Sequence, residues 1–495
     1  MKRGFTLIEL LAVILILGII ALIAIPTVNN ILIESRKGAF NSTVRNILKS
    51  VSEKCTLQQI KNQQIDSIYI LNSGKIYPEL DIKGDLPRGN IYVNNNCEVS
   101  YLLYNSNFSI KKNSFSSEET IEELNRSIYN DPVLKGADPV LDYGMIPVVI
   151  ENNGEVYKAN LKEEWYDYNN KKWANAVLVK EDKRDFYLNA LGGEIINAND
   201  IFGYFVWVPR FKYAIPSGTG ARSIKIIFEN IFNLKSYGSA VDDDYYTHPA
   251  FTFGNKELNG IWIAKFETSG EANMPLSLPN VQSINNQTIE EQFNSSLLLK
   301  NNKTYGVLGN SHMMKNTEWG AMAYLSHSIY GINQEIRINN MNPITTGCGA
   351  SSDNEAEATV CAIPYGGGSE SYPQSSTGNI SGIFDISGGR FERLMAHYSA
   401  TPTPSGFAAR IEKKYYDLYS TLSYDTACDG SICKGHSLTE TKNWYNDYYL
   451  IFNTSRTWIH RGGLYLNNDV AGSFFVDVNS GGTGSTYRVV LNNAN

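Results

Sequence analysis

The distribution of apolar and polar positions predicts one long helix at the start of the chain. No residue from Leu10 to Ile33 is charged, and most of them are apolar. A helix of this length extends roughly 36 Å, which is enough to cross a bilayer. Beyond it, apolar residues recur at steps of three and four, so they share one helical face. They are Phe40, Val44, Ile47, Leu48 and Val51, and they extend the predicted helix to about Cys55.

One acid distinguishes this apolar stretch from a plain membrane anchor. Lys2, Arg3 and Gly4 precede it, and Glu9 lies near its start. A carboxylate at mid-membrane costs roughly 2.5–3.5 kcal/mol, so an acid in such a segment usually has a function. A secretory signal peptide would have a shorter apolar core without acids and a small-x-small cleavage site, which this stretch lacks. A plain anchor would explain the length but not Glu9.

These residues closely resemble the class III signal of the type IV pilin family. Gly4, Phe5 and Glu9 match the positions of the family's glycine, phenylalanine and glutamate, and Pro26 matches a proline that kinks the pilin helix. The resemblance implies that a prepilin peptidase cleaves after Gly4 and that the new Phe5 amine is methylated. It also implies that Glu9 pairs with the Phe5 amine of a neighbouring subunit, which would cancel the cost of burying both charges. The expected partners are other pilin subunits. The expected location is a single-pass membrane helix before assembly and an extracellular surface pilus afterwards.

A small antiparallel sheet is predicted after the helix. Ile91-Tyr92-Val93, the turn Asn94-Asn95-Asn96 and the run from Cys97 to Leu102 alternate around an Asn-rich turn, which is a hairpin signal. This region resembles the strand region of Gram-positive pilins, and a Cys55–Cys97 bridge would join the helix end to it. The residues that follow are polar and acidic, which indicates a linker.

The rest of the chain alternates aromatic strand-like segments with long Gly/Asn/Ser loops. The strand-like segments include Trp165–Tyr168, Tyr204–Val208 and Ile261–Phe266, while helical patterns cover only Thr317–Leu325 and Arg390–Tyr398. No βαβ rhythm appears, so a doubly wound fold is not expected.

A second resemblance is carried by short segments in order along this region. They are Asn316-Thr317-Glu318-Trp319, Gly382–Gly389 with Glu392, Trp458–Gly463 and Tyr487–Val490. They look like the landmarks of the formylglycine-generating-enzyme type of C-type-lectin-like fold. Arg461 and Arg488 are candidates for ion pairs that tie such a loop-rich core together. The expected fold class is therefore α+β: a long pilin helix with a small antiparallel sheet, then a loop-rich C-type-lectin-like domain.

The predicted organisation follows from both resemblances. It comprises a leader peptide (1–4), a pilin helix (5–55, with 5–33 in the membrane or filament core), a head sheet (56–114), a linker (115–137) and a lectin-like domain (138–495).

The cysteines indicate disulfides rather than catalysis. An export signal favours disulfides, and the spacing favours the pairs Cys55–Cys97, Cys348–Cys361 and Cys428–Cys433, with free thiols in a reducing host as the alternative. Catalytic members of the second family bind copper with a cysteine pair of the spacing of Cys428 and Cys433, placed after the Arg-Gly-Gly landmark. Here the pair precedes Arg461, so no enzymatic activity is expected.

Metal and nucleic-acid binding find little support in the sequence. The six histidines show no metal-ligand spacing, and no cofactor is expected. Calcium is conceivable but unsupported, because Asp242-Asp243-Asp244 lacks a spaced loop pattern and Tyr445 interrupts the lectin-like Trp444-Asn446-Asp447 motif. The formal net charge of −7 gives no reason to expect a nucleic-acid partner.

Two function classes remain. In the first, the protein is a minor pilin whose lectin-like head acts as a tip adhesin for a surface glycan or protein. In the second, it is a pseudopilin or an assembly-initiating subunit of a secretion or DNA-uptake machine that binds no ligand. The lectin-like resemblance places the ligand face after the Arg-Gly-Gly landmark. It nominates Trp458, Tyr465, Asn467, Asn468, Asp469, Phe474 and Phe475, although core burial is an equally good interpretation of the two phenylalanines.

Overall fold

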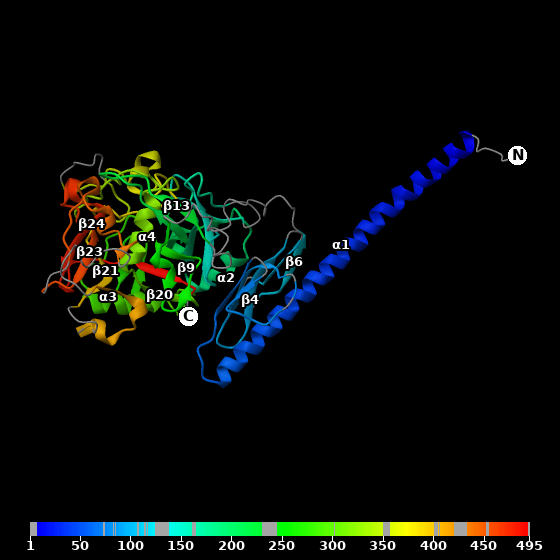
Figure 1. Ribbon diagram of the computed structural model, residues 1–495, viewed down its shortest axis with the longest axis horizontal. Helices are drawn as coiled ribbons and strands as arrows, with labels where there is room; N and C mark the ends of the chain where they lie inside the picture. Colours follow the sequence, from blue (N-terminus) through cyan, green and yellow to red (C-terminus); the bar gives the residue numbers. More distant parts are fainter. Residues whose placement is uncertain are drawn as a thin grey trace.

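The computed structural model shows a mixed α+β fold, rich in sheet, with one long helix at the N-terminus (Figure 1). The described residues are 7–72, 75–82, 84, 86–105, 108–112, 115, 117–123, 138–160, 165–229, 245–300, 302–349, 357–399, 404, 406–419, 433–451 and 455–493. In Figure 1 the first half of the long helix projects away from a large body, and its second half lies along a small sheet beside that body.

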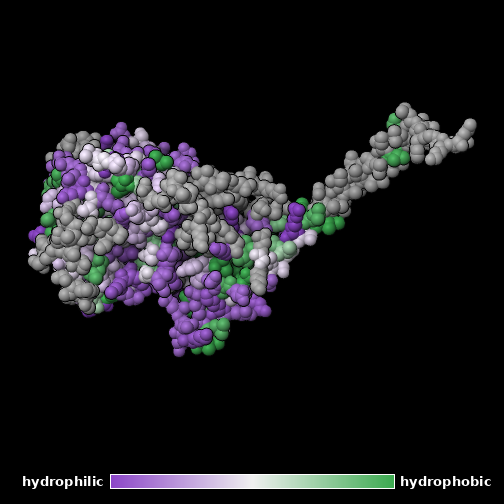
Figure 2. Space-filling model, in the orientation of Figure 1, coloured by the Kyte–Doolittle hydropathy of each residue, from purple (hydrophilic) through white to green (hydrophobic). Residues whose placement is uncertain are grey.

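Helix α1 runs as one element from Leu7 to Ile60, slightly further than predicted. The apolar residues predicted to share a face are all buried, which confirms the helical periodicity; they are Phe40, Val44, Ile47, Leu48 and Val51. Ile31, Leu32 and Ile33 of α1 are exposed. Figure 2 shows hydrophobic surface on the long helix close to where it leaves the rest of the molecule. Among the residues that the structure describes, no helix combines the length and the hydropathy that a membrane crossing needs. The crossing predicted for residues 5–33 stays a prediction.

The sheet beside α1 has six strands in the order β2-β1-β3-β4-β5-β6, each antiparallel to its neighbours. The strands are Ile68–Asn72 (β1), Lys75–Tyr77 (β2), Arg88–Val93 (β3), Val99–Tyr104 (β4), Phe108–Lys112 (β5) and Thr120–Glu123 (β6). The predicted hairpin is confirmed, because β3 pairs with β4 up to Val93 and Val99. Strand β6 lies within the segment 115–137 that was predicted as a linker, so the sheet continues past residue 114.

A disulfide joins α1 to this sheet. Cys55 and Cys97 are bonded, with their Cα atoms 5.8 Å apart, as predicted. Cys55 lies on the buried face of α1, and Cys97 lies in the turn before β4. The bridge fixes the end of the helix against the hairpin.

The six-stranded sheet is covered on both faces, and β1 shows this directly. Successive strand residues point to opposite faces. Tyr69 and Leu71 pack in the core shared with α1, whereas Ile68 and Ile70 pack in the core of the large body. The Ser67 hydroxyl also donates to the Leu308 carbonyl of the large body at 3.0 Å. The small sheet is therefore sandwiched between α1 and the large body.

An eight-stranded sheet forms the centre of the large body, in the order β10-β8-β7-β9-β11-β17-β25-β20. Its strands are Met145–Ile150 (β7), Val156–Lys158 (β8), Asn175–Val179 (β9), Ile195–Ile196 (β10), Ile201–Pro209 (β11), Gly260–Ala264 (β17), Asn310–Met313 (β20) and Val489–Asn492 (β25). Every residue of β9 and β17 is buried, as expected for central strands covered on both faces. Strand β25, close to the C-terminus, pairs with both β17 and β20, so the end of the chain is part of the core.

A second, four-stranded sheet has the order β22-β21-β23-β24. Its strands are Glu392–Tyr398 (β21), Asp417–Tyr419 (β22), Trp458–Gly462 (β23) and Gly472–Asn479 (β24). A three-stranded sheet contains Phe211–Ala214 (β12), Lys225–Phe228 (β13) and Tyr246–Thr247 (β14). A two-stranded sheet contains Thr252–Phe253 (β15) and Lys256–Glu257 (β16), and another contains Ser269–Glu271 (β18) and Met274–Leu276 (β19).

Few helices accompany these sheets. The α-helices are Glu181–Asn189 (α2), Ile289–Ser296 (α3) and Asn316–Ser326 (α4). Short 3₁₀ turns cover Ala198–Asp200, Pro249–Phe251, Leu297–Leu299, Gly368–Gln374, Gly406–Arg410, Lys413–Tyr415, Thr439–Thr441, Trp444–Asn446 and Asn468–Val470. Helix α4 confirms the pattern seen at 317–325, and all of its residues are buried.

Two predictions for the large body are wrong. Residues 390–398 were predicted as a helix but contain strand β21, whose seven residues are all buried. A fully buried strand shows no alternation of apolar and polar residues, and its pairing with β22 and β23 decides its conformation. Trp165–Tyr168 is not a strand and contributes only an isolated bridge between Asp167 and Lys172.

Candidate functional site

Three of the nominated ligand contacts belong to the core instead. Trp458 is 5% exposed, and Phe474 and Phe475 are each 2% exposed. The Trp458 ring lies 4.5 Å from that of His397, and the Phe474 ring lies 4.5 Å from that of His327. Burial contradicts the ligand contact nominated for Trp458, and for Phe474 and Phe475 it confirms the alternative of core burial, because neighbouring side chains cover each ring.

Consecutive residues of β24 explain the burial of both phenylalanines. Phe474 and Phe475 point to opposite faces of the strand, and each face is covered. Phe474 packs against Trp444, with ring centres 5.0 Å apart. Phe475 packs against Phe391 and Tyr448, each with ring centres 5.7 Å away.

The other nominated residues form a surface loop between β23 and β24. Asn468 and Asp469 are exposed, and Tyr465 and Asn467 are half-buried. Two hydrogen bonds hold the loop: the Leu464 N–H donates to the Asn467 Oδ1 at 2.6 Å, and the Tyr465 N–H donates to the Gly389 carbonyl at 2.8 Å. Four of the seven nominated side chains therefore remain available to a ligand.

A neighbouring loop, residues 443–450, adds exposed residues that were not nominated. Tyr448 and Leu450 are exposed, and the Tyr448 N–H donates to the Val470 carbonyl at 3.0 Å, which places the two loops side by side. Tyr445 has a φ of 53°. A left-handed conformation is uncommon for a bulky residue, and such strain often accompanies functional loops. The aromatic and amide residues of 443–450 are visible in the sequence, but their position beside the first loop is not.

Asp447 anchors this second loop from below. Its Oδ2 accepts from the Phe474 N–H at 2.8 Å, and its Oδ1 has no hydrogen-bond partner among the described residues. A Cβ at Gly472 would lie 2.3 Å from either carboxyl oxygen, so only glycine leaves room for this side chain. Burial raises the pKa of Asp447 to about 8. Within the described part of the chain no three His, Cys, Asp or Glu side chains group as metal ligands.

Beneath these loops, Arg461 ties together two of the landmark segments. Its guanidinium donates to the Asn316 Oδ1 at 2.8 and 3.0 Å and to the carbonyls of His436 and Ser437 at 2.9 and 2.7 Å. All these acceptors are neutral, so the ion pair predicted for Arg461 is wrong as far as the described residues go. Burial lowers the pKa of Arg461 to about 10. The side chain organises backbone carbonyls rather than a carboxylate.

Arg488 does form the predicted ion pair. Its guanidinium bonds both carboxyl oxygens of Glu392, with Nε 2.9 Å from Oε2, and both side chains are fully buried. It also donates to the carbonyls of Ala264 and Phe384 at 2.8 and 2.9 Å. Ala264, the segment from Phe384 to Glu392 and Arg488 itself are far apart in the sequence, and they meet at this one cation. The Asp385 and Glu392 carboxyls have raised pKa values because of burial, opposed by the positive charge of Arg488.

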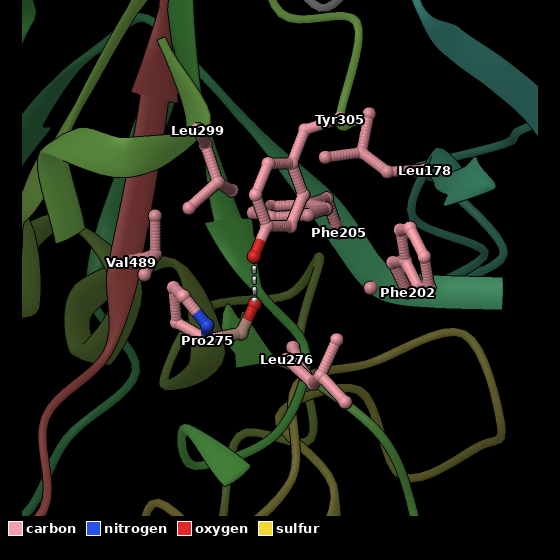
Figure 3. A pocket seen from close by; sticks show the side chains of 10 residues that line it. Leu178, Phe202, Phe205, Pro275, Leu276, Leu299, Tyr305 and Val489 are labelled. Carbon is pink, nitrogen blue, oxygen red and sulfur yellow. Dashed lines mark hydrogen bonds between the residues drawn. The ribbon is translucent and has the colours of Figure 1, made fainter. Parts of the chain in front are cut away.

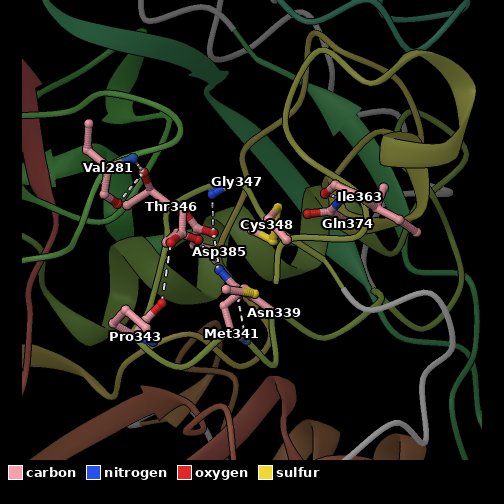
Figure 4. Close-up of a disulfide and its surroundings, with 12 residues drawn as sticks. Val281, Asn339, Met341, Pro343, Thr346, Gly347, Cys348, Ile363, Gln374 and Asp385 are labelled. Carbon is pink, nitrogen blue, oxygen red and sulfur yellow. Dashed lines mark hydrogen bonds between the residues drawn. A yellow bond between two sulfur atoms is a disulfide. The ribbon is translucent and has the colours of Figure 1, made fainter. Parts of the chain in front are cut away.

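The second confirmed disulfide lies beside this cluster. Cys348 and Cys361 are bonded, with Cα atoms 5.7 Å apart. Figure 4 shows Asp385 near this bridge, where its Oδ1 accepts from the Gly347 N–H at 2.7 Å. Cys433 also forms a disulfide, while Cys428, its predicted partner, lies outside the described residues.

A small, partly open pocket in the large body is too small to hold a ligand. Figure 3 shows the apolar side chains that line it, including Phe205, Leu299 and Val489. Its volume of about 10 Å³ is close to the minimum that one water molecule needs. Ligand binding in this region would therefore use surface loops rather than this cavity.

At the N-terminus, the structure describes only part of the signal segment. Gly4 and Phe5 lie outside the described residues, and Glu9 lies within α1 without a described side chain. A family model described as the prokaryotic N-terminal methylation motif matches residues 1–25. No curated protein matches the chain. The motif supports an exported, type IV pilin-like or pseudopilin protein that is processed by prepilin peptidase, anchored in the membrane, exposed at the surface and assembled with other pilins.

Proposed function

We propose that the protein is a minor type IV pilin that carries a non-catalytic, lectin-like adhesive head at the pilus tip. The observation that carries the proposal is the methylation motif at residues 1–25, which overlaps the start of α1, the helix that packs against the small sheet. The small sheet is in turn joined to a large body of aromatic strands and polar loops. Such a body would crowd a filament built only of this chain, which favours a position at the tip.

The N-terminal steps are proposed residue by residue. Prepilin peptidase cleaves after Gly4, and the Phe5 amine is methylated. Residues 5–33 lie in the membrane and later in the filament core, where Glu9 pairs with the Phe5 amine of a neighbour. An apolar environment penalises both isolated charges, so pairing fixes the axial register of the subunits.

A lectin-like arrangement of the large body, residues 138–495, is supported by the way its landmark segments bond to one another. Arg461 bonds Asn316, and Arg488 bonds Glu392. The Gly388 N–H donates to the Gly462 carbonyl at 2.9 Å. The absence of catalysis is proposed from the order of the chain, because Cys428 and Cys433 precede the Arg-Gly-Gly landmark rather than follow it.

The adhesive surface is proposed to be the two adjacent loops of the head. Tyr465, Asn467, Asn468 and Asp469 come from one loop, and Tyr448 comes from the other. Tyrosine faces and amide groups suit the apolar faces and hydroxyls of a glycan, or the mixed surface of a protein.

Purified pili carrying the protein would test this surface on glycan arrays and on host cells. Asn468→Ala combined with Tyr448→Ala should weaken binding about ten-fold or more, since anchor residues of an interface each contribute over about 1 kcal/mol. Asn199→Ala, an exposed change elsewhere on the head, serves as the control. If the double variant and the Asn199→Ala control bind equally well, the two loops are not the adhesive surface. If wild-type pili bind nothing across the panel, the protein is not an adhesin.

A pseudopilin or an initiator of a secretion or DNA-uptake machine is the alternative, because the matched motif ends at residue 25 and applies to those proteins as well. Immunogold labelling of sheared surface filaments separates the two. Label on long extracellular filaments supports the pilin, and label confined to the cell envelope supports the alternative.

A further inference from the structure

A groove lies between α1 and the small sheet, with a volume of about 410 Å³. Its lining comprises Arg45, Leu48, Lys49 and Ser52 of α1, Val99, Tyr101 and Lys112 of the sheet, and Ser117 and Glu119 from the segment before and at the start of β6. Leu48 and Tyr101 are buried and form its floor, so the rim is polar. The groove is on the opposite part of the molecule from the two head loops.

A carboxylate already lies in this groove and shows what it can bind. The Arg45 Nη2 donates to the Glu119 Oε1 at 2.6 Å, and the Tyr101 hydroxyl donates to the Glu119 Oε2. Burial raises the pKa of Tyr101, so the phenol keeps its proton and remains a donor. A cation and a hydroxyl rising from an apolar floor therefore hold one carboxylate by both oxygens.

The remaining charges of the groove are not balanced. Lys112 has no ion-pair or hydrogen-bond partner for its amine among the described residues. Lys49 has only an exposed contact of 3.9 Å to Glu53 on its own helix. The lining thus holds three cations and one carboxylate, on a chain whose formal net charge is −7. This local reversal of sign is what an acidic partner would recognise.

We propose that this groove binds an acidic segment of a neighbouring pilin subunit in the filament, with carboxylates of that segment paired to Lys49 and Lys112. The inference rests on the proposed function and adds a second subunit contact to that of Glu9. Position supports it, because the same helix carries exposed apolar residues, Ile31 to Ile33, on the N-terminal side of the groove.

Position and size disfavour the other anionic occupants. Arg45 follows Ile33 by twelve residues, and a helix rises about 1.5 Å per residue, so the groove begins roughly 18 Å beyond the apolar stretch. That distance lies beyond the headgroups of a membrane in which residues 5–33 are embedded. A pocket of about 410 Å³ accepts a few side chains and is far smaller than the contact surface of a nucleic acid.

Photo-crosslinking in living cells tests the proposal with the full chain. A photoreactive amino acid replaces Ser52 in the groove, and in the control it replaces Asn46, an exposed residue of α1 that does not line the groove. The expected result is an adduct from position 52 to another pilin, mapped by mass spectrometry to a peptide rich in Asp and Glu. Adducts only to lipid, to nucleic acid or to an uncharged peptide would overturn it, as would the same acidic adduct from position 46.

Charge reversal adds a quantitative arm. Lys49→Glu with Lys112→Glu should lower the yield of the acidic adduct about ten-fold, which corresponds to about 1.4 kcal/mol. Lys61→Glu, an exposed change at the end of α1 outside the groove, should leave the yield unchanged. An unchanged adduct yield in the double variant would reject binding of an acidic segment by the groove. The proposed function would still be supported if the wild-type protein is found in sheared pili. Absence of the wild-type protein from pili overturns both.

Discussion

Removing the cation of the buried Arg488–Glu392 pair should destabilise the head strongly. In Arg488→Met, an apolar side chain replaces a guanidinium that bonds both oxygens of Glu392 and two backbone carbonyls. Breaking one side of a buried ion pair costs about 3–5 kcal/mol, because the other group is left without its partner. Glu392 lessens the loss by taking up a proton, which burial already favours through its raised pKa. We therefore expect the free energy of unfolding to fall by about 3–4 kcal/mol.

An exposed Arg–Glu pair joined by a single contact provides the control. Arg410 and Glu290 lie 2.7 Å apart, but their side chains are 63% and 43% exposed. Arg410→Met should therefore cost only about 0–1 kcal/mol, since water and salt screen the pair. The comparison makes the same Arg→Met change in a buried pair with several hydrogen bonds and in an exposed pair with one.

Urea unfolding of the full-length protein in detergent, followed by tryptophan fluorescence, measures both variants. Adding Glu392→Met to Arg488→Met should recover part of the loss, because a buried pair replaced by apolar residues is often neutral. If Arg488→Met and Arg410→Met differ by less than about 1 kcal/mol, the pair does not hold the head together and the reasoning from burial is refuted.

Two further predictions concern the ends of the molecule. Glu9→Val should leave the protein in the membrane but greatly reduce its amount in sheared pili relative to Glu53→Val, which alters an exposed acid of the same helix; equal incorporation of the two would contradict the role of Glu9. Asp447 has a folded pKa of about 8, raised by burial from 3.8, so its contribution to stability is complete below about pH 4 and is lost as the pH rises through about 8. The free energy of unfolding of Asp447→Asn should therefore increase relative to that of the wild type by about 1.4 kcal/mol for each pH unit between those values. Urea unfolding at pH 5, 6 and 7 measures this difference. A pH-independent difference, or the same trend in the exposed control Asp469→Asn, would count against it.

Local patterns predicted the pilin-like end of the chain well. The steps between Phe40 and Val51 fix a helical face without reference to other elements, and that face is buried. The Asn-rich turn specifies the β3–β4 hairpin in the same way. Cys55–Cys97 and Cys348–Cys361 were predicted from spacing and an export signal, because neighbouring cysteines find one another most readily.

The large body was less predictable, because its strands are buried on both faces and its loops are long. The sequence predicts a helix where strand β21 lies, since a strand that is buried on both faces shows no alternation of apolar and polar residues. Phe474 and Phe475 carry the residue types of a ligand surface, yet neighbouring rings cover both. Tyr448 was missed because the hydrogen bond that places its loop beside Asn468 joins residues distant in sequence.

By itself the sequence determined the signal at residues 1–25, the helix that follows it and the small hairpin, since each depends on residues within a few turns of one another. Only the tertiary structure decided which aromatic residues are exposed, which arginine has a carboxylate partner and where a basic groove opens on an acidic protein. Arg488 and Arg461 illustrate the difference: both were expected to form ion pairs, but the acceptors brought to each by distant strands are a carboxylate in one case and neutral oxygens in the other. In the large body, exposure and pairing depend on side chains that converge from segments distant in sequence, which a local pattern does not encode.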